Sequence, residues 1–118
     1  MARVQSLDGS TFDRTLAAAG TPVLVDFYAS WCPPCRALAP ALEQLAGELG
    51  DRSAFFKVNV DEESELAGRF QVRSVPTLAV YAGGEQIYEI PGYVPPAKLR
   101  TFLESVARAG SAVAPEQS

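Results

Sequence analysis

The chain contains two cysteines, Cys32 and Cys35, and only Pro33 and Pro34 separate them. A bridge between them closes too small a loop to restrict the unfolded chain much, so it would add little as a structural crosslink. Two thiols at this spacing suit redox chemistry instead. One thiolate attacks a disulfide sulfur, and the other thiol then resolves the mixed disulfide. The pair therefore predicts thiol–disulfide exchange.

The residues around the pair indicate which sulfur attacks. We expect a strand to end near Tyr28 and a helix to begin near Pro34, because proline suits the first helical turn. Cys32 then lies just outside the helix N-terminus. There the helix dipole and free amide donors, such as that of Cys35, favour a thiolate. We therefore predict Cys32 as the nucleophile and the less exposed Cys35 as the resolving thiol.

Two plainer interpretations of the pair stay open. Zinc normally takes four Cys or His ligands, and the chain has two cysteines and no histidine. A closed zinc site would therefore need a second chain, and we expect no metal site within this one. Alternatively, the two thiols are inert side chains buried in a core.

The composition is that of a single globular domain. Of the 118 residues, 47% are hydrophobic and 20% are charged, with a net charge of −4. Lysines and arginines form no cluster that could hold a phosphate backbone, so we expect no nucleic-acid partner. The longest apolar run, residues 23–28, is far shorter than the roughly 20 residues of a membrane span. No basic region leads into an apolar core near the N-terminus, which favours a cytoplasmic protein without a signal peptide.

Apolar periodicity and Gly/Pro breaks predict the order β-α-β-α-β-α-β-β-α. The predicted strands cover residues 4–6, 23–28, 54–59, 77–81 and 86–90, and the helices cover residues 11–18, 34–49, 62–70 and a segment from residue 96. This order predicts an α/β fold with a mixed central sheet and helices on both faces. We expect one domain over residues 1–109 and a disordered tail over residues 110–118.

Single residues predict several helix and turn boundaries. Ser10 and Asp61 are candidate N-caps of the first and third helices, because their side-chain oxygens can accept hydrogen bonds from free amide groups. Gly50 should end the long second helix. Gly83 and Gly84 predict a tight turn between the last two strands.

Five features in sequence order make residues 4–109 resemble the thioredoxin family. They are Val25-Asp26-Phe27, Trp31-Cys32 with Pro34-Cys35, Pro40 in the following helix, Asn59-Val60-Asp61, and Val75-Pro76-Thr77 before a Gly-Gly hairpin. The resemblance implies the thioredoxin fold and two-electron exchange with disulfides of partner proteins. It further implies an NADPH-dependent flavoprotein thioredoxin reductase as a partner and no bound cofactor. Nothing in the sequence suggests an obligate dimer, so we expect a monomer.

Two charged residues gain roles from this resemblance. Asp26 lies within an apolar strand, where loss of hydration should raise its pKa. The resemblance makes it the buried acid/base that serves Cys35, and it makes Lys57 the family lysine beside it. The alternatives are an Asp26 at an exposed strand position and a solvated Lys57.

The resemblance also implies a substrate-binding surface. Pro76 matches a cis-proline that faces the sulfurs, with the backbone of Val75 pairing with substrate; an ordinary trans loop proline is the alternative. Trp31, Pro34 and Gly92 match a flat apolar rim around the nucleophile, and Tyr93 is a candidate extension of it. For Trp31 and Tyr93 the alternative is packing in the core.

Three residues depart from the family pattern, and they leave the choice of function open. Pro33 stands where the family usually has glycine, Tyr28 where tryptophan is frequent, and Arg36 where lysine is common. We expect a general protein-disulfide reductase. The alternatives are an electron donor dedicated to one pathway, a disulfide isomerase or oxidant, and a binding subunit or holdase without redox turnover.

Overall fold

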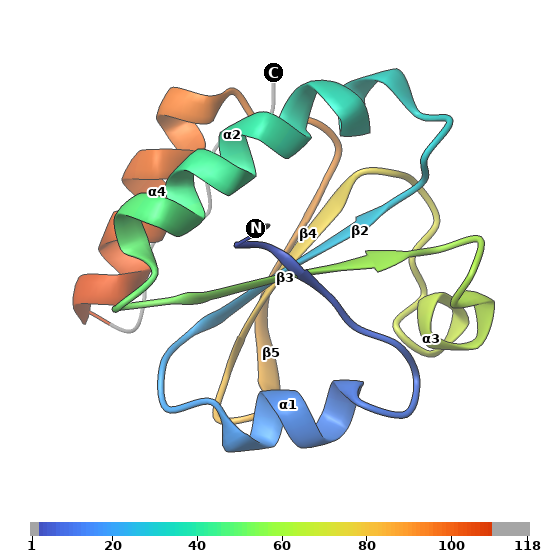
Figure 1. The fold of residues 1–118 in the computed structure, drawn as a ribbon, viewed down its shortest axis with the longest axis horizontal. Helices are drawn as coiled ribbons and strands as arrows, with labels where there is room; N and C mark the ends of the chain where they lie inside the picture. The colour runs from blue at the N-terminus through green and yellow to red at the C-terminus, as the bar shows by residue number, and fades with distance from the viewer. Residues whose placement is uncertain (1–2, 110–118) are drawn as a thin grey trace.

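The structure is a computed structural model that describes residues 3–109 (Figure 1). The predicted tail, residues 110–118, lies outside the described residues. In chain order the elements are β1 (Gln5–Ser6), α1 (Phe12–Ala18), β2 (Val23–Tyr28), α2 (Pro33–Leu49), β3 (Ala54–Asn59), α3 (Ser64–Arg69), β4 (Thr77–Ala82), β5 (Glu85–Pro91) and α4 (Pro96–Ala109). In that part of the chain, none of the helices has the length and apolar character to cross a bilayer.

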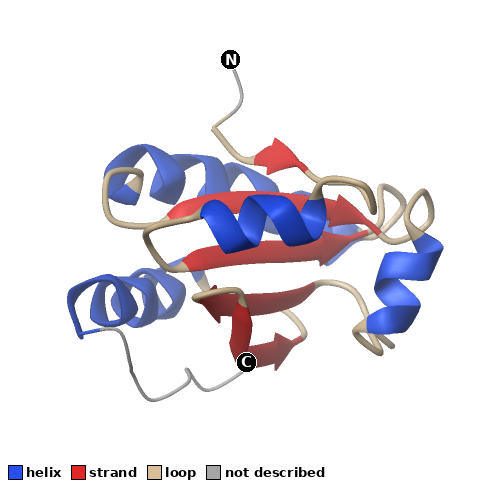
Figure 2. Ribbon diagram, turned by 90° about the horizontal axis from the view of Figure 1, so that it is seen from below, coloured by secondary structure: helices blue, strands red, loops and turns tan. Residues whose placement is uncertain are grey.

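The five strands form one mixed sheet in the order β1-β3-β2-β4-β5. β3 runs parallel to β1 and β2, whereas β4 runs antiparallel to β2 and β5. Figures 1 and 2 show helices on both faces of the sheet: α2 and α4 lie over one face, and α1 and α3 lie on the other side. The predicted α/β class with a mixed sheet between helices is confirmed.

The central strand β2 is buried on both faces, which explains its nearly continuous apolar run. Leu24 packs into the cluster that includes residues of α2 and α4. Val25 and Phe27 pack into the second cluster, with Phe12 of α1. Because side chains alternate along a strand, Asp26 shares the face of Leu24 and lies on the α2 side of the sheet.

The third helix begins later than predicted, and Asp61 does not cap it. α3 starts at Ser64, and no side chain caps its N-terminus. The oxygen Oδ1 of Asn59 accepts hydrogen bonds from the amides of Asp61 and Glu62, at 2.9 and 3.3 Å. The side chain of Asn59 thus closes a turn through Glu62, and α3 begins only after this turn.

Ser10 is not the cap of the first helix either. α1 begins at Phe12, and its N-cap position, Thr11, makes no side-chain capping bond. The carboxylate of Asp8 accepts hydrogen bonds from the amides of Ser10 and Thr11, at 2.9 and 3.0 Å. The acceptor two residues upstream therefore organises this turn, because aspartate readily bonds the backbone two and three residues ahead.

Two glycine positions explain where the chain turns. α2 ends at Leu49 as expected, but Gly50 has φ −62° and does not use the left-handed conformation. Glycine is needed there because a Cβ atom would lie 2.6 Å from the carbonyl oxygen of Ala46. Gly83 and Gly84 have φ +60° and +84°, the values that a tight hairpin turn between β4 and β5 requires.

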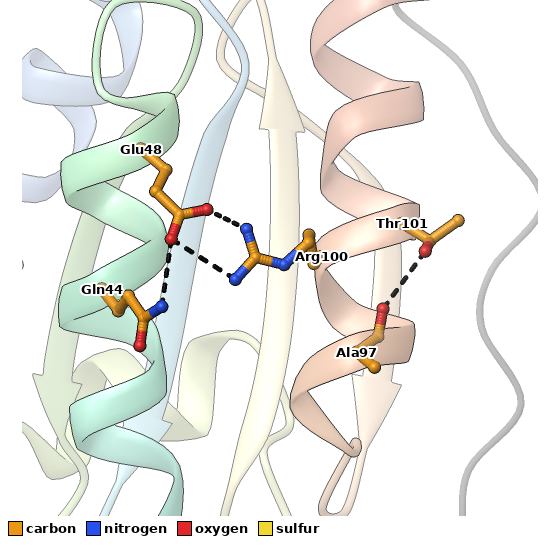
Figure 3. A network of polar contacts seen from close by, with 5 residues as sticks. All are labelled: Gln44, Glu48, Ala97, Arg100 and Thr101. Carbon is orange, nitrogen blue, oxygen red and sulfur yellow. Dashed lines mark hydrogen bonds and ion pairs between the residues drawn. The ribbon is translucent and has the colours of Figure 1, made fainter.

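An ion pair joins the two long helices on one face of the sheet. The guanidinium of Arg100 in α4 bonds the carboxylate of Glu48 in α2, which also accepts a hydrogen bond from Gln44 (Figure 3). Both charged side chains are more than a third exposed, so water and salt screen the pair.

We expect Arg100→Met to lower the free energy of unfolding by no more than about 1 kcal/mol, because methionine retains the aliphatic stem and removes only a screened charge. Urea unfolding at low salt measures the loss. A double-mutant cycle with Glu48→Gln should give a coupling of about 0.2–1 kcal/mol that shrinks in 1 M salt. A coupling of zero at low salt would contradict a stabilising role for the pair.

Candidate active site

Cys32 and Cys35 form a disulfide at the N-terminus of α2, with 5.2 Å between their Cα atoms. Cys32 occupies the N-cap position with extended backbone, and Pro33 and Pro34 occupy the first two helical positions. Because neither proline has an N–H, the first amide donor of the helix belongs to Cys35. That amide donates to Sγ of Cys32 at 3.3 Å.

The two sulfur-bearing residues are equally buried. Each is only 3% exposed, so the expectation that Cys35 is the less exposed of the two is wrong for this disulfide form. The physical reason is that a second segment covers Cys32, whose Sγ lies 3.6 Å from the carbonyl oxygen of Val75. Ala29, Val60 and Val75 pack around the pair.

The loop that covers the disulfide contains a cis peptide bond between Val75 and Pro76, so the alternative of a trans proline is wrong. Pro76 is buried, and its carbonyl oxygen accepts a hydrogen bond of 2.8 Å from the amide of Gly92. The hydroxyl of Thr77 donates to the carbonyl of Ser74 at 2.7 Å. These bonds connect the loop to itself and to the end of β5.

An open groove of about 410 Å³ runs beside the disulfide. Its lining residues come from three segments of the chain: Trp31, Cys32, Pro33, Pro34, Val60, Val72, Arg73, Ser74 and Val75. Trp31 is 64% exposed and its indole N–H donates to Asp61 at 2.8 Å, so its alternative of core packing is wrong. The lining is mainly apolar, which suits extended peptide segments better than a charged small molecule.

Several lining residues were missed from the sequence, and three of the predicted substrate-binding residues do not line the groove. Val60, Val72, Arg73 and Ser74 line the groove; Val60 lies within the quoted motif Asn59-Val60-Asp61, and the other three directly precede Val75. Pro76, Gly92 and Tyr93 are not among the residues that line it. Tyr93 is half-buried and packs against the core cluster on the side of α2 and α4.

The side chain of Asp26 is buried, so the alternative interpretation, in which Asp26 occupies an exposed strand position, is wrong. It is 4% exposed, and its Oδ1 atom has no hydrogen-bond partner among residues 3–109. Burial raises the pKa of Asp26 to about 7, against an opposing effect of the nearby Lys57 charge. A carboxyl group with a pKa in this range can accept and release protons near neutral pH.

Lys57 lies opposite Asp26 in the parallel pairing of β2 with β3. Its ammonium group is also 5.9 Å from the ring centroid of Tyr28. The side chain is half-buried, so it is not the fully solvated strand lysine of the alternative interpretation. The structure thus places the buried acid and the lysine side by side on β2 and β3, and the sulfur pair follows the end of β2 in the chain.

Within residues 3–109, no group of three or more His, Cys, Asp or Glu side chains is placed to hold a metal ion. A zinc site at the cysteines would still need ligands from another chain.

Comparison with known proteins identifies the family. The sequence model described as Thioredoxin matches residues 3–105, which is most of the chain. The chain belongs to the thioredoxin family. Its two cysteines are therefore a redox pair, and the chain is a thiol–disulfide oxidoreductase that acts as a protein-disulfide reductase.

Individual thioredoxins are similar over most of this chain. Thioredoxin M-type, chloroplastic, from Chlamydomonas reinhardtii is 39% identical over 103 residues, which cover 87% of this chain and 74% of that protein. Thioredoxin 1 from Nostoc sp. is 36% identical over 104 residues, covering 88% and 97%. Thioredoxin from Alicyclobacillus acidocaldarius is 44% identical over 85 residues, covering 72% and 81%. These similarities do not favour the binding-subunit or holdase interpretation.

Proposed function

We propose that this chain is a general reductant of disulfides in partner proteins, with Cys32 as nucleophile and Cys35 as resolving thiol. The observation that supports this most is the hydrogen bond from the Cys35 amide to Sγ of Cys32 at the N-terminus of α2. In the reduced form, that donor and the positive end of the helix dipole stabilise a thiolate on Cys32. Thiolate is the attacking species in exchange.

The proposed reaction has two displacements. The Cys32 thiolate attacks one sulfur of the client disulfide, forms a mixed disulfide and releases the first client thiolate, which takes a proton from water. The thiol of Cys35 then loses its proton, and its sulfur attacks Sγ of Cys32, which releases the second client thiolate. The client gains two electrons, and the Cys32–Cys35 disulfide is left behind.

Asp26 is the proposed acceptor of the Cys35 proton, directly or through a water. Support comes from its burial on the face of β2 that α2 covers and from its pKa of about 7. Lys57 moderates the charge that the ionised carboxylate leaves in the core, because an opposite charge nearby favours the ionised form. Both residues are therefore assigned to proton movement rather than to client binding.

The client segment is proposed to lie in the groove beside the disulfide. The backbone of Val75, next to Pro76, would pair with the client in the manner of an added strand. Trp31 and Pro34 provide exposed apolar surface around the sulfurs. Gly92 and Tyr93 would contact only a client segment that extends beyond this groove.

The remaining parts of the proposal concern the cellular setting. A flavoprotein thioredoxin reductase that uses NADPH restores the dithiol, so the chain itself needs no bound cofactor. We propose that the protein acts as a monomeric electron carrier in the cytoplasm. Its only two cysteines form the redox pair, which leaves none for the structural bridges that secreted domains use.

The equilibrium reduction potential of the Cys32–Cys35 couple tests this proposal. Titration against a thiol buffer, read by mass after alkylation, should give a value near the roughly −270 mV of thioredoxin. Pro33 motivates a second candidate, since a proline in place of glycine stiffens the turn between the sulfurs. A potential of roughly −180 to −120 mV would replace the reductase proposal with disulfide isomerisation or formation.

A further inference from the structure

Arg73 is the one charged side chain among the residues that line the groove beside the disulfide. It is exposed, and among residues 3–109 its guanidinium has no hydrogen bond or ion pair. The other lining side chains are apolar, apart from Ser74 and the disulfide itself. A client segment in this groove would therefore contact the unpaired guanidinium of Arg73 beside mainly apolar side chains.

Other charges near the groove already have partners. Asp61 accepts the indole N–H of Trp31, so its carboxylate already has a partner, and Asp61 is not among the residues that line the groove. Arg36, in the first turn of α2, donates to the carbonyl of Ser30 at 3.4 Å and adds a second positive charge near the sulfurs. These two positive charges contrast with the net charge of −4 of the whole chain.

We propose that Arg73 is a specificity-determining residue that selects client segments carrying glutamate or aspartate beside the reactive disulfide. The inference rests on the proposed function, in which a client segment occupies this groove. Guanidinium groups bind carboxylates through two parallel hydrogen bonds, and a free side chain can adopt that geometry without breaking an existing bond. Complementary charge also accelerates the encounter with an acidic client and slows the encounter with a basic one.

The test uses synthetic peptides with one internal disulfide and a single variable residue next to it: Glu, Gln or Lys. We expect kcat/KM to be about two- to tenfold higher for the Glu peptide than for the Lys peptide, with Gln between them, because exposed ion pairs are individually weak. The ratio should fall towards one as salt is raised from about 0.05 to 0.5 M. Arg73→Glu should invert the order.

Arg52→Glu is the matched control. Arg52 is also exposed, and its replacement by glutamate changes the net charge by the same amount as Arg73→Glu. It precedes β3 and lies at the opposite end of that strand from Asn59 and the groove. It should keep the wild-type order of peptides. Equal rates for the three peptides, or the same change in both variants, would overturn the assignment of Arg73.

A neutral small disulfide, 2-hydroxyethyl disulfide, separates this inference from the function on which it rests. The wild type and the control Arg52→Glu should reduce it at the same rate, because it presents no charge to position 52. If the wild type reduces it but does not discriminate among the peptides, the specificity inference fails and the proposed function stands. If the wild type reduces neither it nor any peptide, the proposed function fails.

Discussion

Replacing Cys32 by serine should lower kcat/KM for protein-disulfide reduction by at least a thousandfold. A hydroxyl at this position is not ionised near neutral pH, so it cannot make the first attack on a disulfide. The amide of Cys35 and the helix N-terminus remain in place, but they have no thiolate to stabilise. Reduction of insulin disulfides by the dithiothreitol-reduced protein measures the loss.

The matched variant is Cys35→Ser, which keeps the nucleophile and removes the resolving thiol. It should form stable mixed disulfides through Cys32 and release little reduced client. Mass spectrometry of the trapped complexes identifies the clients: many would favour a general reductase, and one dominant client would favour a dedicated donor. Substantial insulin reduction by Cys32→Ser would contradict the assignment of Cys32 as nucleophile.

Replacing Asp26 by asparagine should raise the free energy of unfolding of the oxidised protein at pH 8. It should also remove the pH dependence of that free energy which the Asp26 carboxyl group causes. The pKa of Asp26 rises from 3.8 in the unfolded chain to about 7 in the fold, so the folded state binds the proton more tightly. The wild type therefore loses stability as pH rises from about 4 to about 7, by roughly 4 kcal/mol in all. Below pH 4 both states hold the proton and the effect disappears.

Asparagine cannot ionise, so any cost of burying its amide is the same at each pH. The difference in unfolding free energy between Asp26→Asn and wild type should therefore grow by roughly 4 kcal/mol between pH 4 and pH 8, in favour of the variant. Urea unfolding of both proteins with the disulfide intact gives this difference. The control Asp51→Asn, at an exposed turn residue, should stay within about 0.5 kcal/mol of wild type. A difference that does not change with pH would contradict a buried, protonated Asp26.

Local sequence patterns predicted most elements because they depend on neighbours within a few residues. Apolar patterns and Gly/Pro breaks placed β2 and β3 over the residues that the structure shows, 23–28 and 54–59. Helical spacing and proline placed α2 to within one residue at its start. The predicted helix caps were wrong because Asp8 and Asn59, each two residues before the expected cap, close a turn there, and each helix begins only after that turn.

In the candidate site, too, local features could be predicted from the sequence and contacts between distant segments could not. Cys32, Cys35 and the chemistry of exchange could be assigned from the sequence, because their spacing at a strand–helix junction brings both sulfurs together. The equal burial of the two cysteines could not be predicted, since Val75, which is 43 residues later in the chain, covers Cys32. Tyr93 likewise packs against the core of α2 and α4, a contact between elements far apart in the chain.

The sequence by itself determined the order of elements, the redox pair and its place at the start of α2, because these follow from residue types and short spacings. Only the tertiary structure decided the depth of Asp26, the shape of the groove and the unpaired charge of Arg73. Each of these depends on which distant segments lie together. Burial raises a pKa only when other elements exclude water, and a groove or a free charge exists only where packing leaves one.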